Sequence, residues 1–276
     1  MDERIYLARA ALHMWEEPCI SGTKGSGAVF FSGCGLRCCF CQNHDIAIGS
    51  RGRAVSVERL GEIFLELKEK GAANINLVTG AHYVPQIIEA LDMARRKGLD
   101  IPVVYNSSGY EKTETLKLLE GYVDIYLPDL KYLDPELAQK FSYAPDYVQA
   151  AKATIGEMVR QTGKCEFGED GYIRKGTIVR HLILPGHTGN SIKALRYLHE
   201  TYGEDIYISI MNQYTPVRKF VEFKELNRKV TKREYEKVLD AAVDMGIQNG
   251  FIQEGETASE SFIPDFDYEG VEKNTP

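Results

Sequence analysis

Short apolar runs alternate with amphipathic segments from residue 28 to residue 254, and no other feature of the sequence constrains the fold as strongly. The main apolar runs have the length of strands: 28–32, 74–79, 102–106, 123–127, 177–184 and 206–211. The segments between them are amphipathic, such as 57–70, which follows a capping Ser56 and stops at Gly71. Strands that alternate with helices of about 10–15 residues indicate βαβ units and a parallel sheet.

Further helices are expected between these strands, and a short strand is expected after them. We place the helices at 84–97, near 114–120, at 135–141, 146–161, 191–202 and 232–245, and the last strand at 250–253. Two arrangements fit this order: an open doubly wound sheet, or a full or partial barrel. The polar, glycine-rich segment 163–176 is expected to rise above the sheet, either as a substrate loop or as a plain surface hairpin.

The length of 276 residues suits one large α/β domain or at most two small ones. We expect a single domain over 1–257 and an acidic tail over 258–276 that wraps the surface or is disordered. No apolar stretch of about 18 residues predicts a membrane span. Residues 1–18 do not resemble a secretory signal, which favours a cytoplasmic protein. The net charge of −7 argues against a nucleic-acid partner.

Four of the six cysteines lie within eight residues. Clustered cysteines without a secretion signal indicate metal or redox chemistry rather than a disulfide framework. Cys34, Cys38 and Cys41 have the spacing C-x₃-C-x₂-C, and three thiolates on a short loop can hold three corners of a cubane iron–sulfur cluster. No fourth cysteine has a matching position, so one iron of such a cluster would stay open to a substrate or cofactor.

These cysteines also admit two other interpretations, a zinc site and plain packing. Cys34, Cys38 and Cys41 together with His44 would make a Cys₃His zinc site, although structural zinc ligands more often come as two separated pairs. Cysteine also packs well as a small apolar residue, but four in eight positions make this a poor explanation. The remaining cysteines are expected to pack rather than to bind metal: Cys39, Cys19 and Cys165.

The predicted strands end in polar, small or metal-binding residues. In parallel barrel folds the active site lies at the carboxyl ends of the strands. The residues at these ends are Cys34, Thr79-Gly80, Asn106-Ser107-Ser108, Asp129-Leu130-Lys131, Pro185-Gly186-His187 and Asn212-Gln213. Surface loops are polar in any protein. The agreement of several strand ends with a cysteine cluster after the first one nevertheless predicts an active site here.

The cysteine segment, with an aromatic residue before its last cysteine, resembles the radical S-adenosylmethionine (SAM) superfamily. Within that superfamily it is most similar to the activating enzymes of glycyl-radical enzymes, the pyruvate formate-lyase activating-enzyme-like proteins. The resemblance covers about residues 27–213 and implies an α/β fold, a partial (β/α)₆ TIM-like barrel with parallel strands. It also implies a [4Fe–4S] cluster held by Cys34, Cys38 and Cys41, with SAM bound at the open iron.

The same resemblance implies a set of SAM-binding residues. Where the family has a Gly-Gly-Glu motif for the SAM amino group, this sequence has Thr79-Gly80-Ala81 and lacks the glutamate. The family also has a polar run near the ribose, matched here by Asn106 and Ser108. Its Asp-Leu-Lys motif, which supports the site and reaches the SAM carboxylate, is matched by Asp129 and Lys131. A strand arginine of the family corresponds to Arg180, and a residue near adenine corresponds to Asn212.

In this superfamily the reduced cluster cleaves SAM, and the 5′-deoxyadenosyl radical abstracts a hydrogen atom. The resemblance implies that the hydrogen comes from a glycine of a partner glycyl-radical enzyme, with a flavodoxin- or ferredoxin-type electron donor. A second hypothesis is a radical SAM enzyme that modifies a small metabolite or a peptide side chain. A third is a zinc-binding interaction module without catalysis. The sequence identifies no catalytic residue beyond the cofactor-binding set.

Overall fold

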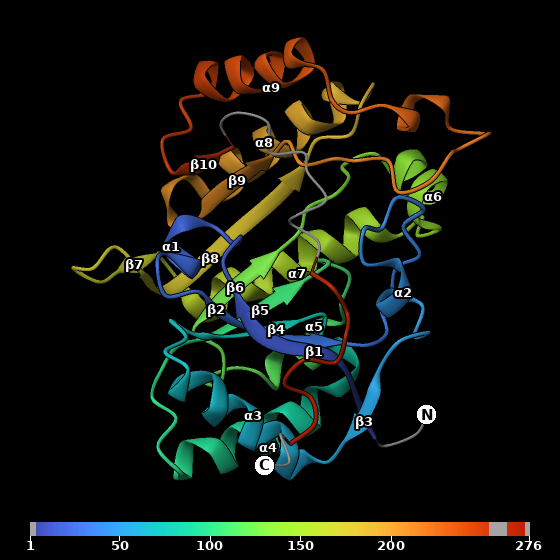
Figure 1. Ribbon diagram of the computed structural model, residues 1–276. Coiled ribbons are helices and arrows are strands. Elements are labelled where there is room, and N and C mark those ends of the chain that lie inside the picture. Colours follow the sequence, from blue (N-terminus) through green and yellow to red (C-terminus); the bar gives the residue numbers. More distant parts are fainter. Residues whose placement is uncertain (1–3, 254–263, 274–276) are drawn as a thin grey trace.

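The computed structural model describes residues 4–253 and 264–273. Its strands form one curved sheet in the order β10-β9-β8-β6-β5-β4-β2-β1-β3, with β7 paired to β8 (Figure 1). From β2 to β10 along this order, neighbouring strands are parallel, which confirms the predicted α/β fold. The strands are β1 (Ile5–His13), β2 (Ser26–Phe31), β3 (Arg53–Val55), β4 (Ile75–Val78), β5 (Val103–Ser107), β6 (Ile125–Pro128), β7 (Glu166–Phe167), β8 (Ile173–Leu182), β9 (Tyr207–Met211) and β10 (Gly250–Ile252).

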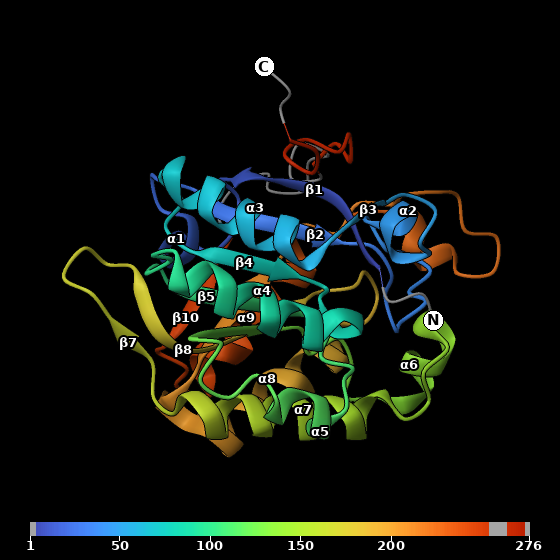
Figure 2. The same ribbon diagram turned by 90° about the horizontal axis from the view of Figure 1, so that it is seen from below.

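Helices cover the outer face of the sheet, with α3 and α4 over one half and α8 and α9 over the other (Figures 1 and 2). The helices are α1 (Pro18–Ser21), α2 (His44–Ala47), α3 (Val57–Glu69), α4 (Val84–Arg96), α5 (Thr113–Lys117), α6 (Pro135–Ser142), α7 (Tyr147–Thr162), α8 (Thr188–Tyr202) and α9 (Lys232–Asp244). As predicted, Ser56 caps α3 by accepting a hydrogen bond from Arg59 N–H at 3.1 Å. In the described ranges, no helix combines the length and the apolar character that a bilayer crossing requires.

The first strand differs from the prediction. β1 precedes the predicted first strand and pairs with β2 in the antiparallel sense, from Leu7 opposite Phe31 to His13 opposite Ser26. β3 then pairs antiparallel with β1. The sequence of β1, IYLARAALH, is rich in alanine, which favours helices. Pairing with β2, which is buried along its whole length, outweighs this local preference.

The chain between β1 and β2 closes the amino-terminal end of the barrel interior. α1 places Cys19 and Ile20 in an apolar cluster with Val104, Ile125 and Ile178. These partners lie on the inner faces of β5, β6 and β8, because the residues that alternate with them pack outward against the helices. The residues just before α1 therefore reach the interior of the barrel from the amino-terminal end of its strands.

Residues 163–176 form a surface hairpin. β7 pairs antiparallel with the start of β8, and Figure 1 shows this hairpin projecting from the side of the molecule. The Tyr172 hydroxyl accepts hydrogen bonds from the N–H groups of Thr23 at 3.1 Å and Lys24 at 3.3 Å. The hairpin lies at the amino end of β8, opposite the end that carries the cysteine loop. Of the two interpretations from the sequence, the structure supports the plain hairpin.

Part of the predicted tail packs along the edge of β1. Tyr268 N–H donates to the carbonyl oxygen of Ala8 at 3.1 Å, and Ala10 N–H donates to that of Glu269 at 2.8 Å. Val271 is buried in the core beyond these bonds. Such pairing covers a strand edge that would otherwise be open. The other residues of the predicted tail, 258–263 and 274–276, lie outside the described residues.

Gly109, just after β5, lies where two backbone segments approach closely. Its φ is +74°, and a Cβ there would collide with the carbonyl oxygen of Asp129, whereas Gly246 has φ +77° and open space around it. We expect Gly246→Ala to lower the free energy of unfolding by about 1–2 kcal/mol through backbone strain. Gly109→Ala should cost about 1–3 kcal/mol more, because the segments must move apart. Urea denaturation measures both values, and equal losses would contradict the close approach.

Candidate active site at the carboxyl ends of the strands

The loop that follows β2 is held in place by α2 and α6. Cys34 N–H donates to the carbonyl oxygen of Ala47 at 3.0 Å, and Cys39 N–H donates to that of Phe141 at 2.8 Å. The Arg37 guanidinium donates to the Cys34 carbonyl oxygen at 2.7 Å. These bonds tie both halves of the loop to neighbouring elements. The thiols are therefore presented at a defined place above the carboxyl end of β2.

The three thiols of the C-x₃-C-x₂-C motif lie close enough to influence one another. Burial raises the pKa of Cys41 to about 12, and Cys38 and Cys34 contribute in the same direction. Burial also raises the pKa of Cys38, although Lys131 and a hydrogen bond from the Ser142 hydroxyl, at 3.0 Å, oppose this effect. Such thiols lose their protons when they bind a metal. Three neighbouring thiols suit three corners of a cubane cluster.

The remaining candidates for a zinc site in this loop do not join the thiols. Cys39 is buried in an apolar cluster with Leu36 and Phe40. His44 is exposed, and its Nδ1 lies 3.8 Å from a carboxylate oxygen of Asp45. Among residues 4–253 and 264–273, no set of three or more His, Cys, Asp or Glu side chains is arranged to hold a single metal ion. The Cys₃His interpretation therefore gains no support from the structure.

A cavity of about 230 Å³ lies inside the barrel beside Cys41. Several of the predicted SAM-binding residues line it together: Thr79, Asn106, Ser108, Asp129 and Arg180. Thr79 has φ +62°, a left-handed conformation that costs about 1–3 kcal/mol and is rare for a β-branched residue. Its N–H donates to the carbonyl oxygen of Asn106 at 2.9 Å, which ties the strained residue to the neighbouring strand.

Arg180 lies at the centre of a largely buried network of charges. Its guanidinium donates to Asp129 at 3.2 Å, to Glu16 at 3.0 Å and to Asn106 at 2.6 Å. Lys131 donates to the second Asp129 oxygen at 2.5 Å. Burial would raise the pKa of Asp129, but Lys131 and Arg180 together hold it below its usual value. Asp129 therefore stays ionised, and each guanidinium nitrogen of Arg180 already has a side-chain partner.

Glu16 is the member of this network that the sequence analysis missed. Besides Arg180, it accepts hydrogen bonds from the amides of Asn76 at 3.0 Å and Asn106 at 3.3 Å. Only 8% of its side chain is exposed. It reaches the site from the segment before α1 and not from a strand end, so the strand-end pattern could not find it. The available signal was indirect: an arginine inside an apolar strand requires buried acids as partners.

Three of the predicted residues do not line this cavity. Gly80 packs against the sheet, and a Cβ there would lie 2.7 Å from the Ile87 side chain. Lys131 lies beside Asp129 and influences the Cys38 thiol. Asn212 N–H donates to the Gln253 side chain at 2.7 Å, and the next residue, Gln213, lines the cavity in its place. Roles for these three residues in SAM binding stay predictions.

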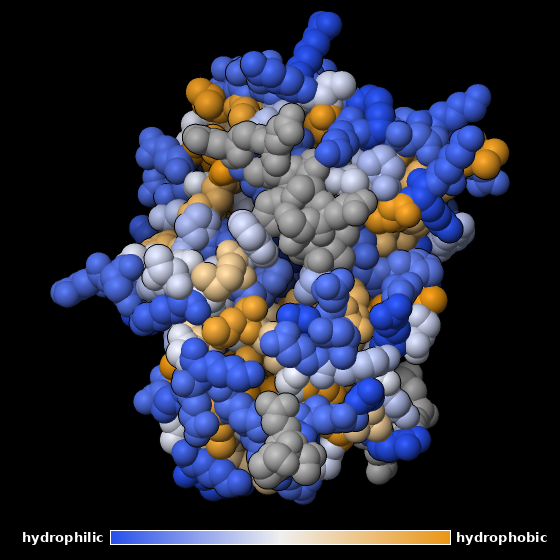
Figure 3. All heavy atoms as spheres, viewed as in Figure 1, coloured by the Kyte–Doolittle hydropathy of each residue, from blue (hydrophilic) through white to orange (hydrophobic). Residues whose placement is uncertain are grey.

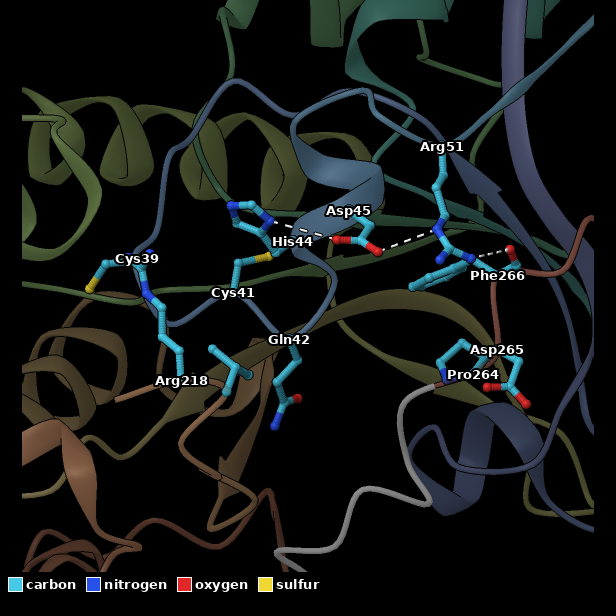
Figure 4. Close-up of a pocket in the computed structure, with 11 residues that line it drawn as sticks. Cys39, Cys41, Gln42, His44, Asp45, Arg51, Arg218, Pro264, Asp265 and Phe266 are labelled. Carbon is cyan, nitrogen blue, oxygen red and sulfur yellow. Dashed lines mark hydrogen bonds and ion pairs between the residues drawn. The ribbon is translucent and has the colours of Figure 1, made fainter. Parts of the chain in front are cut away.

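A larger cavity of about 450 Å³ lies beside the first one, and we call it the outer cavity (Figure 4). The two cavities share Cys41, Gln42 and Pro264. The other residues around the outer cavity are Cys39, His44, Asp45, Arg51, Val217, Arg218, Asp265 and Phe266. The cysteine loop thus separates the barrel interior from a second space on the surface side.

Removing Glu16 tests the buried network. We expect Glu16→Ala to lower the free energy of unfolding by about 2–3 kcal/mol, because Asp129, which also binds Lys131, then remains the acid hydrogen-bonded to Arg180. The exposed Glu200→Ala should change it by about 0.5 kcal/mol or less. Urea denaturation measures both variants. Equal small effects would show that Glu16 does not stabilise the interior.

Comparisons with known proteins identify the family. The profile of the Radical SAM superfamily matches residues 28–198. An uncharacterised protein of Methanocaldococcus jannaschii is 28% identical over 244 residues, which are 86% of this chain and 67% of that protein. The pyruvate formate-lyase-activating enzyme of Clostridium pasteurianum is 27% identical over 113 residues, which are 39% of this chain and 46% of that enzyme.

A solved structure shares the fold. Streptococcus suis SuiB bound to precursor peptide SuiA superposes with a TM-score of 0.53 at 14% identity, over 82% of this chain and 47% of that chain. This chain thus spans about half the length of that structure. The superfamily match covers more than half of the sequence and includes the cysteine loop and the strand ends from β2 to β8. The chain therefore belongs to the radical SAM superfamily, which uses a [4Fe–4S] cluster and SAM.

Proposed function

We propose that this protein cleaves SAM reductively at a [4Fe–4S] cluster and that the resulting 5′-deoxyadenosyl radical takes a hydrogen atom from a glycine of a partner glycyl-radical enzyme. The observation that carries the proposal is the position of Cys41. It belongs to the group of three neighbouring thiols, and it also lines the polar cavity that contains Ser108 and Asp129. A group of neighbouring thiols and a polar cavity therefore lie side by side, which supports the proposal.

The thiols of Cys34, Cys38 and Cys41 are the proposed cluster ligands. When bound, the cluster supplies one electron and SAM supplies the radical, so the protein's task is to position both and to exclude water. Burial of the thiols serves that task. The Lys131 ammonium lies near the Cys38 thiol and offsets part of the negative charge that three thiolates bring.

The polar residues of the inner cavity are the proposed SAM contacts. Ser108 offers a hydroxyl for the ribose, and Thr79 offers a hydroxyl and a strained backbone for the amino group that the family binds with glutamate. Arg180 and Asn106 already bond to each other at 2.6 Å. We propose that this pair shapes the cavity wall and that Lys131 reaches the SAM carboxylate.

Support for a protein substrate comes from the partial relationship with a pyruvate formate-lyase-activating enzyme. The outer cavity adds a structural argument, because it lies beside Cys41 and is large enough to hold several atoms of an extended segment. The electron donor is proposed to be of the flavodoxin or ferredoxin type. The cytoplasmic location stays a prediction.

Two neighbouring cysteines provide a direct test of the cluster ligands. We expect Cys38→Ala to abolish 5′-deoxyadenosine formation, because only two thiolates of the motif would remain. Cys39→Ala should retain a brown, active protein, since Cys39 packs in an apolar cluster. Both variants are reconstituted anaerobically with iron and sulfide, reduced, and analysed for 5′-deoxyadenosine. An active Cys38→Ala protein would refute the ligand assignment.

The substrate is tested with candidate glycyl-radical enzymes from the same source. We expect electron spin resonance to detect a glycyl radical on the partner after incubation with the reduced protein and SAM, and no signal with Cys38→Ala. If 5′-deoxyadenosine forms but no partner acquires a radical, the activating role is wrong. Product analysis of cell extracts would then search for a modified metabolite or peptide side chain, which is the second candidate substrate.

The hydrogen bond to Cys38 should tune the reduction potential of the cluster. The Ser142 hydroxyl donates to Cys38 Sγ at 3.0 Å and also contacts the Tyr132 hydroxyl at 2.8 Å. Hydrogen bonds to cluster sulfurs stabilise the reduced state. We expect Ser142→Ala to shift the potential to a more negative value, measured by redox titration of the spin-resonance signal. Tyr132→Phe, which keeps the bond to Cys38, is the control and should change the potential less.

A further inference from the structure

The outer cavity contains two arginines with different surroundings (Figure 4). Arg51 lies 3.3 Å from the Asp45 carboxylate and donates to the Phe266 carbonyl oxygen at 3.4 Å. Arg218 has neither an ion pair nor a hydrogen bond to any residue in the part of the chain that the structure describes. Its guanidinium lies 5.3 Å from the centre of the Phe220 ring. The charge of Arg51 is therefore matched, and that of Arg218 is open to a ligand.

Arg218 is also placed close to the thiols. It comes from the loop after β9, and Figure 4 shows its side chain extending toward Cys39. It lines the outer cavity and a neighbouring cavity of about 190 Å³ that Cys38 also lines. A guanidinium presents a planar set of donors that matches a carboxylate, and the resulting hydrogen bonds are stronger than those between neutral groups. This position suits the capture of an acidic group next to the reaction centre.

We propose that the outer cavity is the substrate site and that Arg218 binds a carboxylate of the substrate. This inference rests on the proposed function and names a chemical feature of its substrate. If the substrate is a glycyl-radical enzyme, the carboxylate belongs to an aspartate or glutamate close to the reacting glycine. Gln42 lines both cavities, and its amide donates to the Gln213 carbonyl oxygen at 3.2 Å. The reacting carbon passes beside this residue to reach the inner cavity.

The opposite wall of the outer cavity limits the charge that a substrate brings. Asp265 lies there, and the structure shows no ion pair to its side chain among the described residues (Figure 4). A second acidic group would meet this carboxylate and be repelled. The site therefore selects one acid at Arg218, with a neutral or positive group at Asp265, and rejects a polyanion.

The face of the molecule shown in Figure 3 is mixed in polarity. On the face shown in Figure 3, outside the grey residues, hydrophobic side chains are scattered among hydrophilic ones and do not form one broad patch. Interfaces of this kind gain specificity from a few well-placed polar contacts. An acid bound by Arg218 is such a contact.

The proposal is tested with peptides of defined charge. Capped pentapeptides carry one glycine and one glutamate at separations of one, two or three positions, and a matched set carries glutamine in place of glutamate. Butyrate, which carries a single carboxylate, serves as a small-acid probe. Binding is measured by calorimetry on the anaerobically reconstituted protein with SAM present. We expect at least one glutamate peptide to bind about tenfold more tightly than its glutamine match, as a charge-assisted hydrogen bond predicts.

Variants of two adjacent residues separate a specific site from general charge. Arg218→Ala should abolish the preference for glutamate, and Arg218→Lys should keep part of it. Lys219→Ala removes the same charge from the next residue and should preserve the preference. Binding of butyrate without binding of any peptide, lost in Arg218→Ala, would retain the acid site and identify a small acid as its ligand.

Three results would overturn the proposal: equal binding of both peptide sets, a preference that survives Arg218→Ala, or no binding of any probe. The proposed function fails separately, because it requires 5′-deoxyadenosine formation, whereas the calorimetry requires no turnover. An unaltered protein that shows the acid preference and makes no 5′-deoxyadenosine would keep the binding site and refute the radical chemistry.

Discussion

The buried guanidinium of Arg180 is the interaction on which the barrel interior depends. A cation inside an apolar strand loses its hydration, at a cost of several kcal/mol, unless acids and hydrogen-bond acceptors surround it. Here those partners come from three separate places: Glu16 before α1, Asn106 in β5 and Asp129 after β6. One side chain therefore couples four parts of the chain. The antiparallel course of β1 also serves Arg180, because the chain that follows β1 places Glu16 in the interior.

Much of the architecture could be predicted because its signals are local. Each parallel strand is a short apolar run, and α3 has a capping serine within one turn of its start. β1 could not be predicted in this way, since its alanine-rich sequence favours a helix and only its pairing with β2 makes it a strand. The same limit applies to residues 264–273, whose position depends on an edge of β1 more than 250 residues away in sequence.

The candidate site likewise contains residues that local sequence patterns predict and residues that they do not. Residues that follow strands were found by their place in the pattern, and Thr79, Ser108 and Asp129 indeed line one cavity. Arg180 was expected to help hold SAM, and the structure adds that Glu16 and Asp129 bind its guanidinium. The outer cavity could not be predicted at all. Its walls come from the cysteine loop, the loop after β9 and the segment after residue 263, which no sequence motif connects.

Residues 264–273 contact β1 but are synthesised long after it, so this side of the molecule forms late. The loop that carries the thiols rests on Phe141 and packs with Tyr214, and both of these residues leave the ribosome before residue 215. Pro264, Asp265 and Phe266 leave about fifty positions later and only then wall the outer cavity. These two contacts of the thiol loop can therefore form while that side of the molecule is still open. Until then Cys39 and Cys41 lack the wall that Pro264, Asp265 and Phe266 provide in the complete chain.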